Sequence, residues 1–456
     1  MGSLAIAGVF AFLLALSRIP GIESFFPWPL GFFHKGLVIH VVFSFVVWFL
    51  AVFGGLLVIA THAVGGPSPR LAGLGRAATF VMWGALPLLF VPALLDRGEA
   101  TLNNYVPTII DPVYYAGLIM MAAAMVLAVT RLLVNLPGRR AGGQPMILAM
   151  TASAAVFLVA IICFAMSLSL LSGQKPSHAF NEELFWGGGH VLQILNTQML
   201  IIAWTFLGGL VLASTAALER AAMVATVSLV GVALLAPWFY VLYPPFAAEQ
   251  MLAFTNLQYA LGPAACGVAV VIAVQCITRG DIKREGIEKG GRVRRDMPWR
   301  EPAFLCLALS AALFMVGGAF GLFVDGADTR TPAHYHGVIA AITLAFMGLF
   351  YTLFLPALNR PATPGKAMAA QIFLFAGGQL TACIGLFLAG GFGAPRKTAG
   401  AAQGLQDAGA MMGMAMNGIG ALIAIIGGIM FIWIAAAALL RTRRARKGHV
   451  VSPLQP

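Results

Sequence analysis

The sequence predicts an all-α, polytopic membrane bundle of about twelve transmembrane helices. The chain has 456 residues, of which 60% are hydrophobic and only 10% are charged, whereas soluble domains carry about 25% charged residues. Its apolar runs are long enough to cross a bilayer, which takes roughly 20 residues per helix. Its basic residues are distributed unevenly between these runs, as they are in membrane proteins with a fixed orientation.

Twelve apolar runs are expected to be spans. The first of them has no basic residues ahead of it and ends in a poor cleavage site, Ser17-Arg18-Ile19-Pro20. We therefore interpret it as an uncleaved helix and not as a signal peptide. In chain order the spans cover residues 2–18, 36–61, 77–95, 112–133, 146–171, 184–214, 221–243, 252–277, 302–323, 333–357, 368–391 and 411–440.

The charges predict the orientation. With the N-terminus inside, the cytoplasmic segments hold 21 of the 28 Lys and Arg residues, as the positive-inside rule requires. Residues 1–456 then form one transmembrane domain with a charged cytoplasmic loop at 279–301, a basic cytoplasmic tail at 441–456 and both termini inside. The net charge of +12 reflects this topology and does not indicate a nucleic-acid partner. Lipid binding by the tail is a secondary alternative.

The five cysteines all fall within expected spans, and none belongs to a C-x-x-C pattern. They are interpreted as small packing residues, so the sequence predicts no disulfide, no c-type haem and no thiolate metal site.

Four histidines lie within membrane reach. They are His40, His190, His334 and His336, and each falls near the outer end of its span. At 1.5 Å per residue they occupy one layer within roughly 10 Å of the outer surface. An ionisable residue inside a membrane is a candidate functional residue, and independent packing histidines are not expected to share one depth.

The segment "HYHGVIAAITLAFMG" begins with two histidines separated by one residue. Residues i and i+2 of a helix lie about 200° apart, so His334 and His336 face opposite sides. Each could hold a different haem iron through a neutral imidazole. The alternative is a pair of interfacial histidines that donate hydrogen bonds to lipid headgroups.

These segments resemble subunit I of the haem-copper oxidase superfamily, which includes cytochrome c oxidase and the large subunit of nitric oxide reductase. The H-x-H pair matches the start of the family's tenth helix. "HVVFSFVVWFLAVFGG" matches its second helix, "LFWGGGHVLQ" its sixth, and "GFGAPRKTAG" the basic motif after its eleventh. The resemblance covers nearly the whole chain.

The resemblance implies a role for each residue of these motifs. His40 and His336 would be the two ligands of a low-spin haem, and His334 the ligand of a high-spin haem. His190 would be a copper ligand, and Arg396 and Lys397 would lie near the haem propionates, where basic residues have an electrostatic rationale. In this interpretation His190 and His334 flank the catalytic position.

The chain departs from the family at the copper site. Family oxidases carry adjacent histidines on the seventh helix, where this chain reads "PWFYVLYPPFAAEQ" (237–250) without any histidine. Copper needs several nitrogen ligands, so its presence is doubtful and the chain is a divergent member. The expected spans also lack deep Lys, Arg, Asp or Glu. Gln193 and Thr197 could line a neutral proton path, or could simply bond between helices.

The resemblance implies a respiratory membrane oxidoreductase of the terminal-oxidase type, with two b- or a-type haems. It would reduce O2 or NO with electrons from cytochrome c or quinol, alongside further oxidase subunits, in the inner membrane of a bacterium. The alternatives are a non-catalytic haem protein, which relays electrons, senses gas or assists oxidase assembly, and a twelve-span transporter without haem.

Overall fold

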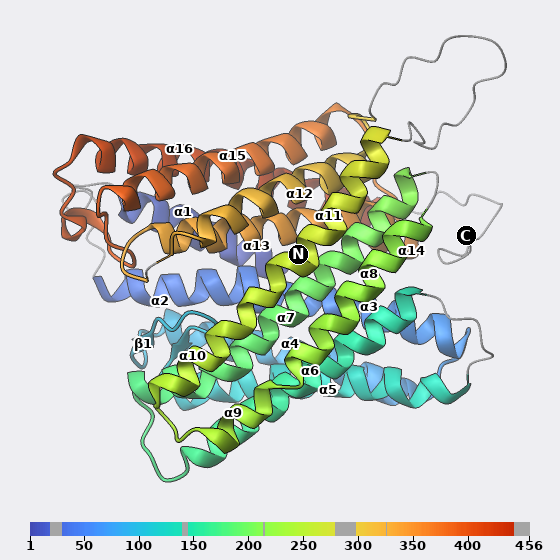
Figure 1. Cartoon of the computed structure of the whole chain (residues 1–456), viewed down its shortest axis with the longest axis horizontal. Helices are drawn as coiled ribbons and strands as arrows, with labels where there is room; N and C mark the ends of the chain where they lie inside the picture. The colour runs from blue at the N-terminus through green and yellow to red at the C-terminus, as the bar shows by residue number, and fades with distance from the viewer. Residues whose placement is uncertain (19–29, 139–144, 213–214, 279–297, 325, 442–456) are drawn as a thin grey trace.

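The computed structural model describes residues 1–18, 30–138, 145–212, 215–278, 298–324 and 326–441, which fold almost entirely into helices (Figure 1). The elements, in chain order, are α1 (Gly2–Ser17), α2 (Leu30–Val41), the π-helical η2 (Val42–Val47), α3 (Trp48–Gly65), α4 (Ala72–Leu94), β1 (Ala100–Thr101), β2 (Thr108–Ile109), α5 (Pro112–Asn135), η3 (Leu136–Gly138), α6 (Pro145–Leu170), α7 (His178–Val211), α8 (Ala216–Ala233), α9 (Ala236–Leu242), α10 (Ala248–Leu257), η4 (Gln258–Ala260), α11 (Leu261–Thr278), α12 (Pro302–Gly321), α13 (Arg330–Leu349), the π-helical η5 (Phe350–Phe354), α14 (Leu355–Ala357), α15 (Lys366–Gly391), η6 (Gly400–Gln403) and α16 (Ala408–Leu440).

The predicted all-α membrane bundle is confirmed. Within the described residues, eleven helical segments are long and apolar enough to span a membrane, and Gly2–Ser17 is a shorter apolar helix. These twelve segments coincide with the expected runs. The expected cytoplasmic loop (279–301) and tail (441–456) fall almost entirely outside the described residues.

Local sequence signals explain where several helices begin. Asp111 accepts a hydrogen bond from the backbone N–H of Val113 and precedes a proline, which is a favourable first helical residue. Ser177 caps α7 and Asp407 caps α16 in the same manner. The expected seventh span is divided into α8 and α9 just before Pro237, because proline has no N–H to continue the helical ladder.

Helix α7 is the central helix of the bundle. Its most apolar window is 78% buried, against 28% for α16 at the periphery. Figure 1 shows α15 and α16 along one side of the bundle and α5, α6 and α9 along the opposite side. The residues that α7 presents are therefore surrounded by protein and shielded from lipid over most of their length.

Small residues bring α15 and α16 into close contact. A Cβ atom on Gly385 would lie 2.4 Å from the backbone nitrogen of Asn417, and one on Gly420 would lie 2.4 Å from that of Ala382. Backbones approach this closely only where side chains are absent, which is a common way to join helices in membranes. Through α15, this closely packed pair lies beside α13.

Both histidine-bearing helices that carry the expected haem ligands contain a π-helical segment. In the first, Val42–Val47 follows His40 by two residues. The Ser44 hydroxyl donates to the carbonyl oxygen of His40 over 2.6 Å, as serines within helices often do. The second segment, Phe350–Phe354, continues α13 into α14. π-helical segments are frequent at functional sites.

Candidate functional site

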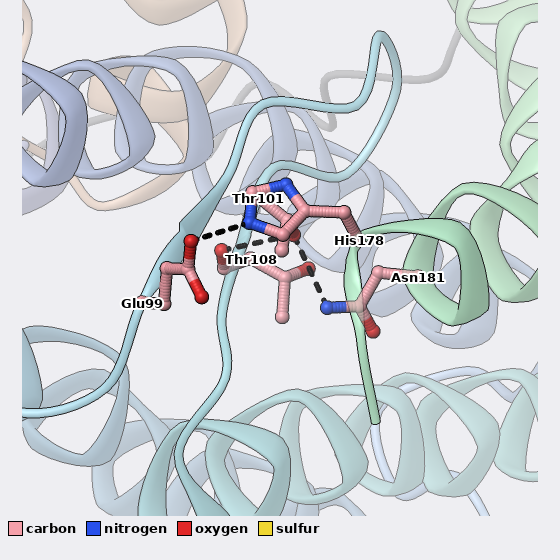
Figure 2. Close-up of polar contacts among 5 residues, drawn as sticks. All are labelled: Glu99, Thr101, Thr108, His178 and Asn181. Carbon is pink, nitrogen blue, oxygen red and sulfur yellow. Dashed lines mark hydrogen bonds and ion pairs between the residues drawn. The ribbon is translucent and has the colours of Figure 1, made fainter. Parts of the chain in front are cut away.

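One end of the bundle carries all four candidate histidines, and we call it the hairpin end because the β1–β2 hairpin covers it. Ala100 pairs with Ile109 and Thr101 with Thr108 in this hairpin. Figure 2 shows how it is attached to the start of α7. The Asn181 amide donates to the Thr101 hydroxyl over 3.1 Å, and His178 lies 2.8 Å from the Glu99 carboxylate. The charge distribution predicts that this end faces outward.

His40 and His336 come from different helices and interact with each other electrostatically. The Nδ1 atom of His40 donates to the carbonyl oxygen of Ala7 on α1 over 3.0 Å. This bond leaves Nε2 of His40 as the nitrogen available to a metal. The two imidazoles thus lie within electrostatic range of each other, and their pairing as low-spin haem ligands stays a prediction.

Near this pair, some side chains are partly exposed and one hydroxyl has no hydrogen-bond partner within the described residues. His40 and His336 keep part of their side-chain surface open although they lie deep among the helices. Tyr335 between the two α13 histidines is likewise 36% exposed. The Thr331 hydroxyl, one turn before His334, is buried and has no hydrogen-bond partner within the described residues. Partly exposed imidazoles with an orphaned hydroxyl close by in the chain are chemically compatible with a bound haem.

His334 faces a different helix from His336, as the i, i+2 spacing predicts. Its Nδ1 atom donates to the carbonyl oxygen of Gly317 on α12 over 2.7 Å. A Cβ atom on Gly321 would lie 2.7 Å from the His334 ring, so the absence of a side chain there makes room for the imidazole. A metal-binding histidine usually donates its second N–H to a carbonyl in this way, which fixes the ring and makes the other nitrogen a better ligand.

His190 is fully buried, and both of its ring nitrogens have partners. Nδ1 lies 2.7 Å from the carbonyl oxygen of Trp186, and Nε2 lies 2.9 Å from the hydroxyl of Tyr105. A carbonyl oxygen can only accept, so Nδ1 carries the proton and Nε2 accepts the hydrogen bond from Tyr105. The rings of Tyr105, Trp186 and Phe254 surround the imidazole.

The three glycines before His190 provide space for this aromatic shell. A Cβ atom on Gly187 would lie 2.2 Å from the Tyr240 hydroxyl, and one on Gly188 would lie 2.4 Å from the Phe164 ring. Gly189 makes room for the Tyr105 side chain in the same way, at 2.4 Å. The glycine run therefore lets aromatic side chains contact the α7 backbone on three sides.

The residues around His190 do not fit a copper ion. Copper requires several free nitrogen or sulfur donors at one point, whereas the lone pair of His190 accepts a hydrogen bond from Tyr105. No group of three potential metal-ligating side chains occurs within the described part of the chain. This hydrogen bond does not favour the copper-ligand role for His190, which stays a prediction.

Arg396 and Lys397, the predicted propionate partners, lie against the hairpin. Lys397 donates to the carbonyl oxygen of Leu102, and Arg396 donates to the Asn104 side chain over 3.4 Å. Arg396 also interacts electrostatically with Tyr335, which lies between the two α13 histidines. Burial, together with repulsion from Arg396, lowers the pKa of Lys397 to about 8. The role of these residues toward a propionate stays a prediction.

Three residues at this end of the bundle were not predicted from the sequence. Tyr105 lies in the hairpin, and its contact with His190 joins positions 85 residues apart. Glu182 and Glu183 precede the expected start of the sixth span at 184, but α7 begins at His178 and includes them. The only local signal was the run "NEELFWGGGH", where two acids directly precede the aromatic and glycine residues.

A fourth missed residue is Arg18, which follows α1. It interacts electrostatically with His336, His40 and Tyr335, and its backbone carbonyl accepts a hydrogen bond from Gln403 over 2.7 Å. A basic side chain therefore lies beside the predicted low-spin ligand pair.

Comparisons with known proteins identify the fold and the family. No protein-family model matches the chain. The structure is similar to a chain of a heme-copper terminal oxidase dimer solved by cryo-EM, with a TM-score of 0.76 and 14% sequence identity over 98% of this chain and 83% of that chain. An uncharacterized protein of Aquifex aeolicus is 30% identical over 76% of this chain and 81% of its own length. An uncharacterized protein of Rickettsia prowazekii is 24% identical over 95% and 92%, respectively.

The chain is therefore a multi-pass membrane protein with the fold of a heme-copper terminal oxidase. It belongs to the same family as the Aquifex aeolicus protein. At 14% identity the structural likeness establishes the fold alone, so the activity has to be argued from the site.

Proposed function

We propose that this chain is a haem-binding membrane oxidoreductase that takes electrons from cytochrome c or quinol and passes them to a small gaseous ligand, O2 or NO. His40 and His336 would hold one haem, and His334 would hold a second. A haem in these positions would supply one-electron storage and, where one axial position stays open, a place for a diatomic gas. The electron donor is inferred from the family resemblance, and the haem ligands are inferred from the geometry.

The observation that carries the proposal is the hydrogen bond between His334 Nδ1 and the carbonyl oxygen of Gly317, 2.7 Å long. This bond orients the imidazole and fixes its tautomer, so the lone pair of Nε2 is available to a metal. The pairing of His40 with His336 from two helices supports a second, doubly ligated haem, which would relay electrons only. The oxidase-like fold supports the assignment, and it gives the transporter alternative no support.

A second candidate function is favoured by the His190 cluster. Because Tyr105 occupies the lone pair of His190, the position opposite the His334 haem would lack the second metal that supplies an electron and a Lewis acid in the family. A chain of this kind could relay electrons or bind gas without reducing it. Both candidates share the haem ligands, and they differ in whether the bound gas is reduced.

One experiment separates the two candidates. The purified protein is reduced anaerobically and mixed with O2 or NO in a stopped-flow spectrometer. An oxidoreductase is expected to return to the oxidised spectrum and to repeat this with added reductant. A stable gas adduct without reoxidation would instead indicate the relay or sensor function, and the absence of any haem signal would contradict both.

A further inference from the structure

The end of the bundle opposite the hairpin contains a buried arginine. α4 ends at Leu94 shortly before the hairpin, α5 begins at Pro112 directly after it, and the two helices pack against each other. The first turn of α4 and the last turns of α5 therefore lie roughly 30 Å from the hairpin. Arg131 lies on this part of α5 and is only 8% exposed. The charge distribution predicts that this end faces the cytoplasm.

The guanidinium of Arg131 lies against the first turn of α4. A Cβ atom on Gly75 would lie 2.6 Å from Nη1 of Arg131 and 3.1 Å from its Cζ atom. Because α4 begins at Ala72, Gly75 belongs to the first turn of the helix. The absence of a side chain at Gly75 thus makes room for the guanidinium beside the helix N-terminus.

The same turn of α4 has backbone donors without acceptors. Its N-cap residue is Leu71, whose side chain cannot accept a hydrogen bond, and no acidic residue lies in the turn. The backbone N–H groups of Ala72 and Gly73 have no acceptor within the part of the chain that the structure describes. Such a helix N-terminus carries a partial positive charge and is a favourable place for an anion.

The Arg131 side chain is a second, independent indication of an anion. Among the described residues, its single hydrogen bond runs from Nε to the carbonyl oxygen of Arg70 over 3.5 Å. Neither Nη1 nor Nη2 has a hydrogen-bond or ion-pair partner among these residues. A buried charge is costly unless it is paired. An unpaired guanidinium beside an uncapped helix N-terminus therefore indicates a site for an anionic ligand.

A purely structural role does not account for these donors. Asn135 already holds the turn before α4, because its Oδ1 atom accepts from the Arg70 N–H over 2.8 Å and its Nδ2 atom donates to the Arg70 carbonyl oxygen over 3.3 Å. A guanidinium has five N–H groups, and within the described ranges the turn uses only the one on Nε. The exposed side chains of Arg70 and Arg76 add positive charge around the turn.

We propose that Arg131 and the first turn of α4 form a binding site for a phosphate group. The guanidinium presents a planar fork that matches two phosphate oxygens, and the N–H groups of Ala72 and Gly73 would bind a further oxygen. The site lies at the opposite end of the bundle from the candidate histidines and does not depend on the proposed function.

Two sources of the phosphate group can reach this position. The most apolar window of α4 is only 17% buried, so the helix is open to lipid, and its first turn lies at the depth of the headgroups. Basic pockets between membrane helices on the cytoplasmic side bind anionic headgroups of this kind. A soluble phosphate compound would instead arrive from the aqueous side.

The test is a titration of the purified, full-length holoprotein in a non-ionic detergent and a phosphate-free buffer. Dioctanoyl phosphatidylglycerol, inorganic phosphate or dioctanoylglycerol is added, and thermal unfolding is followed. A ligand that binds only the folded protein raises the melting temperature according to its affinity. Phosphatidylglycerol is expected to raise it, whereas dioctanoylglycerol, which has the same acyl chains without a phosphate, is not.

Arg131→Gln is expected to weaken phosphatidylglycerol binding at least about tenfold, which is the loss for one hydrogen bond to a charged group. Arg220→Gln is the matched control. Arg220 is an exposed arginine at the same end of the bundle, and its Nε also donates to a backbone carbonyl oxygen, that of Ala216, over 3.2 Å. Its helix, α8, carries the acidic Glu219 in the first turn, so this variant is expected to bind like the wild type.

Gly75→Ala tests the position of the guanidinium without changing the charge of the protein. The added methyl group displaces Nη1 of Arg131, which is the flexible end of a side chain, so the fold is expected to tolerate it. The variant is expected to lose most of the lipid-induced shift, while its melting temperature without lipid stays close to that of the wild type. Gly75→Ala decides the question if Arg131→Gln does not fold.

The outcomes separate the two sources and can overturn the site. A shift that depends on Arg131 and occurs with phosphatidylglycerol but not with inorganic phosphate would assign the phosphate to a lipid headgroup, whereas an equal shift with inorganic phosphate would assign it to a soluble compound. The proposal is wrong if neither probe raises the melting temperature, or if Arg131→Gln and Gly75→Ala keep the full shift. Equal losses in Arg131→Gln and Arg220→Gln would also contradict it, because binding would then follow net charge alone.

Discussion

His334 and Gly317 are joined by a hydrogen bond of 2.7 Å from the imidazole Nδ1 to the backbone carbonyl oxygen, across the contact between α13 and α12. The same glycine brings the two helices together, because a Cβ atom on Gly317 would lie 2.7 Å from the backbone nitrogen of Val338. One position thus fixes both the packing of the two helices and the orientation of the ring.

Gly317→Ala is expected to destabilise the protein. The added methyl group meets backbone atoms of α13, so the helices must separate, at a cost of about 1–3 kcal/mol. Thermal unfolding in detergent measures this loss. Gly318→Ala is the matched control, because a Cβ atom there meets nothing within 4 Å. Equal melting temperatures for the two variants would contradict the close contact.

Gly189→Ala is expected to displace the hairpin. A Cβ atom at this position lies 2.4 Å from the Cβ atom of Tyr105, which must move away from His190. Hydrogen exchange of the backbone amides in residues 100–109 is expected to become faster. Gly231→Ala on α8 is the control, since a Cβ atom there would meet nothing within 4 Å. Unchanged protection of the hairpin would show that Tyr105 does not rest on α7.

The lowered pKa of Lys397 predicts a pH dependence of stability. In the folded protein Lys397 loses its proton near pH 8, whereas its ordinary pKa is 10.5. Between these values the unfolded chain binds more protons, so stability is expected to rise with pH in this window. The whole shift corresponds to at most about 3 kcal/mol, and solvent screening of this half-buried group reduces it. Melting temperatures across the window check this, and Lys397→Met is expected to abolish the rise. An identical rise in that variant would assign it to another group.

Copper is expected to remain well below one equivalent per chain after expression in copper-supplemented medium. The reason is that Nε2 of His190, the ring nitrogen without a proton, accepts a hydrogen bond from Tyr105. In addition, no histidine lies on α8 or α9. Elemental analysis measures copper and iron together. About one copper per chain that disappears in His190→Ala would overturn this account of the cluster.

The sequence alone predicted the helical membrane bundle. Apolar length is a strong signal, so the twelve expected runs coincide with helices. The spacing of His334 and His336 also predicted correctly that they face different partners, because helical geometry fixes the angle between positions i and i+2.

The surroundings of His190 could not be predicted in this way. Tyr105 reaches it from a hairpin 85 residues earlier in the chain, and no periodic pattern encodes such a contact. The start of α7 at His178 depends on the cap at Ser177 and not on hydropathy, which explains why Glu182 was placed outside the span. The π-helical segment after His40, which contacts α1, was not predicted from the sequence.

The most direct test of the central claim is the haem content of the purified protein, measured with a reduced-minus-oxidised spectrum before and after addition of CO. We expect about two haems per chain, one low-spin and one that binds CO. His40→Ala and His336→Ala are expected to remove the low-spin signal and His334→Ala the CO-binding signal, whereas His62→Ala, exposed on α3, changes neither. A wild-type protein without haem, or one whose haem survives all three substitutions, would contradict the assignment.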